Sequence, residues 1–409
     1  MSDGMHIVFV APFFMDTTLR FVRAVAELPG VHCGLISQEP KERLPPDLRK
    51  SLAGYAQLEN ALDAGQIAQG VALLQNKLGR AVRLLGTLEH MQAQLAQVRE
   101  KLEIRGIGVD AAQNFRDKAK MKDALRAAGL PCARHKSLLN TEDAWSFVAD
   151  VGYPIVIKPR DGVGSAVTFR VDDEAELKGA LQAVRPSPQN PAIAEEFITG
   201  EEHSFEVASI NGKPVWHSLT QYAPTPLEVI RNPWIQWTVL LPREIDSPAY
   251  DAVRAVGFRA LQVLGMDTGI SHMEWFRRKD GTVAISEIAA RPPGAQIMTL
   301  NSFAHDIDMY KAWARMMVFE KFEPPPRKHA VGAAFFRGQG RGRVTRVHGL
   351  ERAQKDVGHL VVEARLPQIG QPQASSYEGE GYAVLRHAET SVVQNALRQL
   401  VSTVRVDLG

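Results

Sequence analysis

Two strand-like runs joined by a tight turn place the strongest constraint on how this chain folds. Residues 269–294 read GISHMEWFRRKDGTVAISEIAARPPG, with strand-forming runs on both sides of Asp280-Gly281. An Asp-Gly pair between two such runs is typical of a two-residue hairpin loop. With this loop Glu274 lies opposite Glu287, and strand alternation places His272 on the same face as Glu274. The sequence therefore predicts an antiparallel hairpin in which two carboxylates face each other.

Two carboxylates directly across a strand ladder repel each other unless a cation lies between them. A pair of oxygen ligands without a histidine or thiolate cluster suits magnesium that is shared with phosphate oxygens. The hairpin therefore predicts a magnesium site at Glu274 and Glu287. The alternative is a solvent-facing hairpin whose glutamates pair with Arg277 and Arg278. A three-residue loop would also change the pairing.

A second strand-like run, residues 152–171, carries a lysine and then breaks into a glycine-bearing loop. It reads GYPIVIKPRDGVGSAVTFRV, with Lys158 before Gly162, Gly164 and Ser165. An ammonium group can meet phosphate oxygens, and small residues let backbone N–H groups approach an anion. No Gly-Lys-Ser/Thr follows the glycines, so this is not a Walker A loop. The run predicts a phosphate site, with an exposed strand lysine beside a flexible turn as the alternative.

Two further segments fit a nucleotide site. We expect a helix from Arg116 to Gly129, in which Lys118 lies closer to the edge of the apolar stripe than Lys120 or Lys122. Residues 192–210, AIAEEFITGEEHSFEVASI, predict a strand, a short acidic turn and a second strand. The backbone of the first strand could read an adenine edge, and an acidic side chain after it could bind ribose hydroxyls.

Composition limits the class of protein. A chain of 409 residues is too long to fold around one compact core, so we expect two or three domains. A formal net charge of +2 gives no electrostatic reason to expect nucleic acid or a membrane surface as partner. Cys33 and Cys132 lie far apart, which favours a reducing compartment over a disulfide framework. No signal peptide or membrane span is evident, and we expect a cytoplasmic protein.

In chain order, the motifs FRDK, YPIVIKPRDGVGS, EEFITGEEHS and HMEWF…ISEIAARPPG resemble the ATP-grasp superfamily, specifically its carboxylate–amine ligase and biotin-carboxylase-like branch. The resemblance covers almost the whole chain. It implies an α/β (α+β) fold: a Rossmann-like N-terminal domain at 1–108, an ATP-grasp domain at 109–325 with a mobile lid at about 131–197, and a small C-terminal α+β domain at 326–409.

The resemblance also implies where ATP is held. Lys118 and Lys158 would contact its phosphates, Lys158 would reach the adenine side as well, and Glu202 would bind the ribose. A mobile loop would cover the triphosphate, and the strand before Glu202 would read adenine. The residues of that loop and strand are Gly162, Gly164, Ser165, Glu195, Glu196, Phe197 and Ile198.

For the chemistry, the resemblance implies that Glu274 and Glu287 hold one or two magnesium ions, which manganese could replace. Many family members carry Asn at the position of Ala289, so a second ion lacks one ligand here. Arg291 would face the transferred phosphoryl group and, with Lys158, act in catalysis. His272, Arg291 and Gly294 would face the substrate.

The activity implied is an ATP-dependent carboxylate–amine ligase that forms an amide through an acyl phosphate and releases ADP and phosphate. Its substrates would be small carboxylates and amines, by family expectation amino acids, and a homodimer is the assembly expected by analogy. The alternatives are a biotin-carboxylase-like or purine-type carboxylase that phosphorylates bicarbonate, and a catalytically inactive ATP-binding regulatory protein.

Two tryptophans lie outside these motifs. Trp234 and Trp237 could line a substrate pocket together with Arg231. Tryptophans are more often core or interface anchors, so the sequence favours a packing role.

Overall fold

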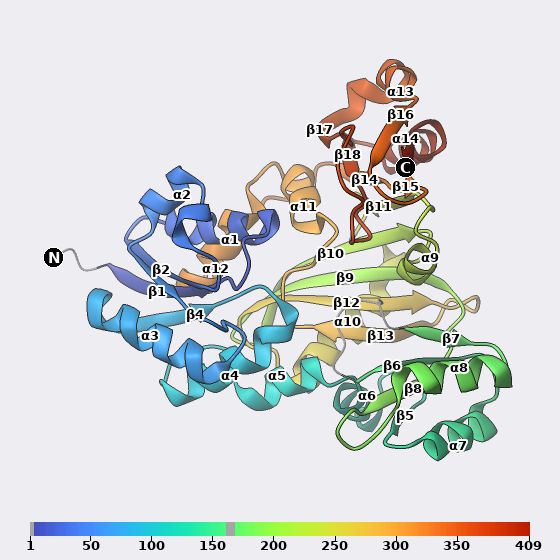
Figure 1. The fold of residues 1–409 in the computed structure, drawn as a ribbon, viewed down its shortest axis with the longest axis horizontal. Coiled ribbons are helices and arrows are strands. Elements are labelled where there is room, and N and C mark those ends of the chain that lie inside the picture. Colours follow the sequence, from blue (N-terminus) through green and yellow to red (C-terminus); the bar gives the residue numbers. More distant parts are fainter. Residues whose placement is uncertain (1–3, 161–167) are drawn as a thin grey trace.

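The structure is a computed structural model that describes residues 4–160 and 168–409, and these residues form four β-sheets (Figure 1). The mixed α/β class that the sequence predicts is confirmed. The predictions for Gly162, Gly164 and Ser165 lie outside the described residues. Within the described ranges, no helix combines the length and the apolar character that a bilayer crossing needs.

The N-terminal sheet has four parallel strands with helices on both faces. Its elements are β1 (Met5–Val10), β2 (Val31–Ser37), β3 (Gly54–Gln57), β4 (Ala81–Leu85), α1 (Asp16–Ala26), α2 (Pro46–Ser51), α3 (Ala64–Leu78), α4 (Gln92–Lys101), η1 (Lys41–Arg43) and η2 (Glu89–Met91). The strand order is β3-β2-β1-β4. Ile7 and Phe9 pack toward α1, whereas Val8 and Val10 pack toward α3 and α4. Burial of both faces explains why this strand is apolar throughout.

Two helices follow, and the second is the one that the sequence predicted. They are α5 (Val109–Arg116) and α6 (Lys118–Ala127), separated at Asp117. The side chain of Asp117 accepts hydrogen bonds from the backbone N–H groups of Ala119 and Lys120. An aspartate at this N-cap position satisfies donors that the first turn of a helix leaves open. The helix predicted from Arg116 to Gly129 is confirmed as α6, which begins at Lys118 and ends at Ala127.

A small antiparallel sheet with two helices on one face comes next. Its elements are β5 (His135–Leu138), β6 (Ile155–Pro159), β7 (Phe169–Val171), β8 (Ala192–Glu196), α7 (Thr141–Val151) and α8 (Glu174–Val184). The strand order is β5-β8-β6-β7. Ile155 and Ile157 face the two helices and are buried. Strand alternation therefore turns Lys158 to the opposite face of this sheet.

The large antiparallel sheet has the order β13-β12-β9-β10-β11-β14-β18-β17. Its strands are β9 (Glu201–Ile210), β10 (Lys213–Ala223), β11 (Trp237–Leu241), β12 (Gly269–Arg277), β13 (Val283–Ala289), β14 (Ala330–Phe336), β17 (Val361–Arg365) and β18 (Gly381–His387). The helices along this part of the chain are α9 (Pro226–Arg231), η3 (Pro248–Tyr250), α10 (Asp251–Leu264), α11 (Ile297–His305) and α12 (Met309–Phe319). Figure 1 shows α12 among the N-terminal elements, where Trp313 packs against Phe9 and Phe21.

The predicted hairpin is β12-β13, and it pairs Glu274 with Glu287 as expected. The predicted two-residue loop is wrong, because Arg278 and Thr282 close a three-residue loop in which Gly281 has φ of 83°. That loop shifts the pairing by one residue. A bulge between Trp275 and Glu274, where Ser286 is the extra residue on β13, shifts it back.

The C-terminal residues extend the large sheet and add a three-stranded one. The further elements are β15 (Gly338–Gln339), β16 (Val344–His348), α13 (Leu350–Val357), η4 (Gly358–Leu360), α14 (Thr390–Thr403) and β19 (Arg405–Leu408). Strand β14 pairs with β11 on one side and β18 on the other. The large sheet is thus continuous across the predicted boundary at 325/326. The domain boundaries stay predictions.

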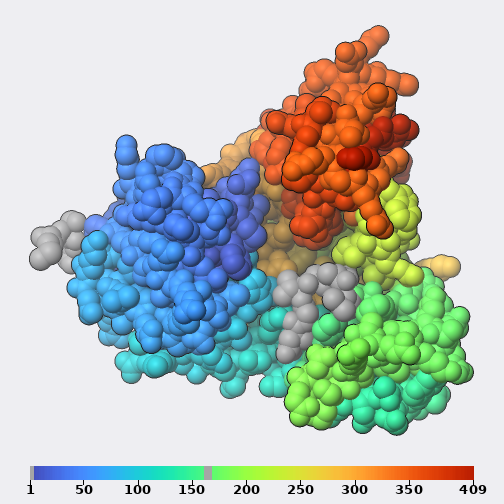
Figure 2. All heavy atoms as spheres, in the orientation of Figure 1, coloured from blue at the N-terminus to red at the C-terminus, as the bar shows by residue number. Residues whose placement is uncertain are grey.

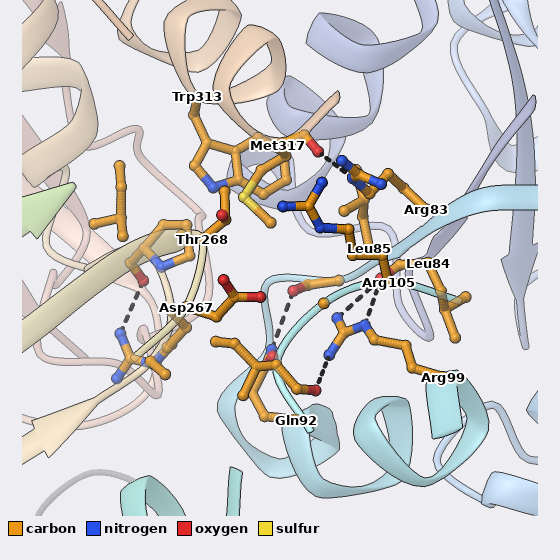
Figure 3. Close-up of a pocket in the computed structure, with 18 of the residues that line it drawn as sticks. Arg83, Leu84, Leu85, Gln92, Arg99, Arg105, Asp267, Thr268, Trp313 and Met317 are labelled. Carbon is orange, nitrogen blue, oxygen red and sulfur yellow. Dashed lines mark hydrogen bonds between the residues drawn. The ribbon is translucent and has the colours of Figure 1, made fainter. Parts of the chain in front are cut away.

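A cluster of arginines, of which Arg99 is buried, joins β4 to α12 and to the residues before β12 (Figure 3). The guanidinium of Arg99 donates hydrogen bonds of 3.0 and 2.9 Å to the carbonyl of Leu84. Arg83 donates to the carbonyl of Met317 and pairs with Glu320 at 3.0 Å. Burial lowers the pKa of Arg99 to about 10, so this side chain stays charged at neutral pH. The cavity here is about 40 Å³, too small for a nucleotide, and we interpret the cluster as a structural clamp.

Replacement of Arg99 by methionine should destabilise the protein by about 2–4 kcal/mol, because the buried carbonyl of Leu84 loses its charged donor. Thermal or urea unfolding measures this change. The matched control is Arg80→Met, whose side chain is 70% exposed and lies 3.8 Å from Glu103. That surface pair should contribute less than about 1 kcal/mol. Equal effects of the two substitutions would contradict a clamp at Arg99.

Candidate active site

One cavity of about 490 Å³ collects the predicted site residues. Its lining comes from the small sheet, the large sheet, α6 and Glu89 of η2, which belong to the blue, green and orange-red lobes of Figure 2 and the parts between them. Every predicted site residue that the structure describes lines it. These residues are Lys118, Lys158, Glu195, Glu196, Phe197, Ile198, Glu202, His272, Glu274, Glu287, Arg291 and Gly294.

At the centre of the cavity, lysines from two elements meet carboxylates from two strands. The ammonium of Lys158 on β6 lies 3.0 Å from Glu195 on β8 and 4.0 Å from Glu287 on β13. Lys118, at the start of α6, lies 3.0 Å from Glu287. These ion pairs connect the small sheet to the hairpin. They leave positive charge beside a carboxylate that could also bind a cation.

The electrostatics follow from these contacts. Burial alone would raise the pKa of Glu287, but the charges of Lys118 and Lys158 outweigh it and lower the pKa to about 2. Burial alone would lower the pKa of Lys158, but Glu195 and Glu287 raise it above its ordinary value. Glu287 and Lys158 are therefore both ionised at neutral pH. The expectation of an unshielded repulsive pair at Glu274 and Glu287 is wrong, because lysines already neutralise Glu287.

Lys122 belongs to this cluster, and the sequence analysis missed it. Its side chain is buried, donates to the carbonyl of Ser286 at 2.8 Å and lies 3.5 Å from Glu195. The expectation that Lys122 lies farther from the apolar side of the helix than Lys118 is wrong. The spacing of four residues, which places both lysines on one face of a helix, could have revealed it. The bulge at Ser286 supplies the carbonyl that Lys122 binds.

His272 connects the metal-facing side of the hairpin to a buried carboxylate. Its Nδ1 lies 2.8 Å from Glu206 on β9, and its Nε2 lies 3.7 Å from Glu274. Burial alone would lower the pKa of His272, but hydrogen bonds to Glu206 and Glu274 raise it to about 9. The imidazole is therefore cationic at neutral pH. Glu206 is a site residue that the motifs did not single out.

Arg291 is held in the cavity by a residue of the N-terminal part. Glu89 of η2 accepts bonds of 2.9 and 2.7 Å from Nε and from one terminal nitrogen of Arg291. The other terminal nitrogen donates to the carbonyl of Pro292. A guanidinium has five N–H donors, so the bonds to described residues leave two for a ligand. Glu89, which the sequence analysis also missed, fixes the direction in which they point.

The expected adenine and ribose side of the cavity has a different character. Glu195 is buried and engaged by lysines, whereas Glu196 pairs with Arg134. Burial and the charge of Glu274 raise the pKa of Glu202 well above its ordinary value. The backbone of β8, rather than the side chain of Glu195, is thus the part of this strand left for a base. The nucleotide roles of these residues stay predictions.

The donor set fits magnesium only with phosphate oxygens as partners. Within residues 4–160 and 168–409, no group of three or more Asp, Glu, His or Cys side chains could hold a metal ion by itself. Glu274 and Glu287 face each other, and Ala289 lies opposite His272 on the same ladder. Two carboxylates shared with phosphates are what magnesium takes in such sites. Ala289 supplies no side-chain oxygen of the kind that an asparagine would offer. The residue opposite it, His272, presents a cationic imidazole.

Comparison with known proteins identifies a domain in this part of the chain. Residues 123–305 match the sequence profile of the ATP-grasp domain. The protein therefore contains an ATP-grasp domain, and the resemblance to the ATP-grasp superfamily is confirmed.

Two of the similar proteins are ligases. An alanine–anticapsin ligase of Bacillus subtilis is 28% identical over 250 residues, which are 56% of this chain and 52% of that protein. An L-arginine-specific L-amino acid ligase of Bacillus subtilis is 23% identical over 313 residues, 74% of each chain. The chain spans about half the length of the alanine–anticapsin ligases that it matches.

Solved structures show the same fold. The crystal structure of an L-amino acid ligase from Bacillus licheniformis superposes with a TM-score of 0.77 at 19% identity and covers 100% of both chains. An N5-carboxyaminoimidazole ribonucleotide synthetase from Thermotoga maritima gives 0.70 at 17% identity and covers 99% of this chain and 100% of that one. These matches confirm the predicted ATP-grasp fold.

The lysine contacts of Glu287 lead to a stability prediction. Glu287→Gln should lower the stability of the nucleotide-free protein at pH 7 by roughly 1–3 kcal/mol, because two lysines lose a charged partner. The pKa of Glu287 lies below its ordinary value of 4.5, so its contribution is full above about pH 4.5 and declines toward pH 2. Thermal unfolding of the parent and of Glu287→Gln at pH 7 and at pH 4 measures how much stability the substitution removes at each pH.

Glu274→Gln is the matched control for this prediction. Among the ion pairs between described residues, Glu274 has only His272, at 3.7 Å. Its substitution should therefore change stability less than Glu287→Gln. A Glu287→Gln protein that is as stable as the parent at pH 7, or more stable, would show that the lysines do not stabilise this carboxylate.

Proposed function

We propose that the protein is an ATP-dependent ligase that joins a carboxylate to an amine through an acyl phosphate and releases ADP and phosphate. The observation that carries this proposal is the convergence of Lys118, Lys158 and Arg291 on the facing pair Glu274 and Glu287 in one cavity. Phosphoryl transfer from ATP to a carboxylate brings two anions together. Positioned cations are therefore what the reaction needs most, and no enzyme nucleophile is required.

Each cationic side chain has a distinct task in this proposal. Lys118 and Lys158 bind phosphate oxygens and reduce the repulsion between ATP and the acid. Arg291, which Glu89 orients, offers its two remaining N–H donors to the acid carboxylate. It then stabilises the oxyanion that forms when the amine attacks the acyl phosphate. The amine attack expels phosphate and leaves the amide.

Glu274 and Glu287 would hold magnesium together with phosphate oxygens. When bound, the ion supplies charge neutralisation at the transferred phosphoryl group. Glu287 stays available as a ligand because its low pKa keeps it ionised. The number of ions is part of the proposal, and one ion is favoured because Ala289 supplies no oxygen.

The relatives support amino acids as substrates. One ligates alanine with anticapsin, and another is an L-arginine-specific L-amino acid ligase. A carboxylase that phosphorylates bicarbonate is the alternative, and an assay with bicarbonate as the acid tests it. The homodimer and the cytoplasmic location stay expectations.

Hydroxylamine in place of the natural amine tests the proposal. With ATP, magnesium and an amino acid, the protein should release ADP and phosphate and form a hydroxamate. Arg291→Ala should bind ATP with parent-like affinity yet lose at least about 90% of the hydroxamate, because it lacks the acid-binding donors. Lys158→Ala should lose hydroxamate and also bind ATP roughly tenfold or more weakly.

The matched control is Lys178→Ala, because Lys178 is exposed and pairs only with Glu174 among the described residues. It should keep both activities. AMP as the stoichiometric product would indicate an adenylate instead of an acyl phosphate. Hydroxamate formation that persists in Arg291→Ala would remove this residue from the reaction.

A further inference from the structure

The cavity has a second end that the proposed chemistry does not use. Besides the charged groups, its lining contains aromatic and aliphatic side chains near Arg291 and Gly294. The residues of this end, which we call the apolar wall, are Tyr222, Leu227, Ile230, Trp237, Ala295, Ile297 and Tyr377. They come from β10, α9, β11, the start of α11 and the segment before β18.

The aromatic part of the apolar wall is fixed in place. Trp237 is buried and stacks between Phe335 at 5.2 Å and Tyr222 at 5.6 Å. Its indole N–H donates to the carbonyl of Pro224 at 3.1 Å. The ring of Tyr377 meets Trp237 edge-on, with centroids 5.1 Å apart. Such contacts position Tyr222 and Tyr377 before any ligand arrives.

Tyr377 reaches the site from the C-terminal part of the chain. A Cβ atom at Gly294 would lie 2.7 Å from the Tyr377 hydroxyl, so the two residues are in close contact. Gln296 donates to Glu378 at 3.0 Å and fastens the same segment to the start of α11. Burial and the charge of Glu378 outweigh the nearby charge of Arg291 and raise the pKa of Tyr377 to about 12. The hydroxyl is therefore a neutral group beside Arg291.

Helix α9 supplies the aliphatic part. Leu227 and Ile230, three residues apart on one side of the helix, are partly buried and line the cavity. Glu228 and Arg231 lie on the exposed side of the cavity rim. The carboxylate of Glu228 is already engaged by Thr225 in the capping box that begins α9.

We propose that the apolar wall binds the side chain of the acid substrate and selects an aromatic or branched aliphatic group, with Tyr377 as a specificity-determining residue. The inference rests on the proposed function, because the carboxylate must lie at Arg291. An acid held there, between the lysine cluster and the apolar wall, directs the rest of its structure toward Tyr377. An apolar side chain would fill this end of the cavity, whereas a charged one would lose its hydration there without a buried partner.

The first test compares five acids, L-phenylalanine, L-leucine, L-alanine, L-glutamate and L-lysine, each with hydroxylamine as the amine. L-phenylalanine or L-leucine should exceed L-alanine by roughly tenfold to a hundredfold in kcat/KM for ADP release, and the charged acids should fall below L-alanine. The highest kcat/KM with L-glutamate or L-lysine would overturn the inference, since a rim residue would then select the acid.

Variants test the wall itself. Tyr377→Ala should reduce the preference for L-phenylalanine over L-alanine roughly tenfold, through KM more than kcat. Ile230→Lys, on the short helix α9, should shift the preference from L-leucine toward L-glutamate. Trp234→Ala is the control, because Trp234 is 55% exposed and does not line the cavity. An unchanged preference in both Tyr377→Ala and Ile230→Lys would overturn the inference.

Calorimetric binding separates this inference from the proposed function. In the presence of ADP and magnesium, L-phenylalanine should bind more tightly than L-glutamate, and Ile230→Lys should reverse the order. This result would support binding at the apolar wall even if no acid gave ADP release. A lack of ADP release with every acid would contradict only the proposed ligase activity. Tighter binding of L-glutamate than of L-phenylalanine to the parent protein would contradict the inference about the apolar wall, even if the protein is an active ligase.

Discussion

The ion-pair cluster between the small sheet and the hairpin is the interaction on which the site depends. Lys158 of β6 contacts Glu195 of β8 and Glu287 of β13, and Lys118 of α6 contacts Glu287 as well. The apolar core supports the same arrangement, because Met121 of α6 packs with Ile285 and Ile288 of β13. Bringing charges out of water is costly unless they are paired, so the geometry that pairs them also fixes the two sheets relative to each other. The same cations are those that a triphosphate would need.

Residues from the whole length of the chain complete the site. Glu89 orients Arg291 from the N-terminal part, and Tyr377 closes the other end of the cavity from the C-terminal part. The large sheet makes this arrangement possible, because β14 and β18 belong to the same sheet as β12 and β13, which carry Glu274 and Glu287. In the same way, Arg83 holds the N-terminal sheet against α12 through the carbonyl of Met317 and the carboxylate of Glu320. Each end of the chain therefore contributes one wall of the cavity.

The sequence predicted the parts of the site that short motifs encode. Strand alternation was enough to face Glu274 toward Glu287 and to turn Lys158 out of its local core. The loop at Gly281 was misread, and the pairing survived only because the bulge at Ser286 offsets the error. An Asp-Gly pair alone does not fix the length of a turn, because the residue next to the pair can belong either to the strand or to the loop.

Long-range contacts were beyond the sequence. Glu89, Glu206 and Tyr377 lie outside the motifs, and only the folded chain brings them to Arg291 and His272. Lys122 is different, because its spacing from Lys118 placed it on the same helical face and its burial follows from that. The side chain at Asp117 ended one helix and began another, which a periodic apolar pattern does not reveal.

The fate of the carboxylate oxygen tests the central claim most directly. An acid that supports turnover, such as L-phenylalanine or L-leucine, is labelled with ¹⁸O in both carboxylate oxygens, and the released phosphate is analysed by mass spectrometry. Acyl-phosphate chemistry predicts one ¹⁸O atom in each phosphate, because the amine displaces the oxygen that bridged carbon and phosphorus. Unlabelled phosphate, or label recovered in AMP, would contradict phosphoryl transfer to the acid at the lysine and carboxylate cluster.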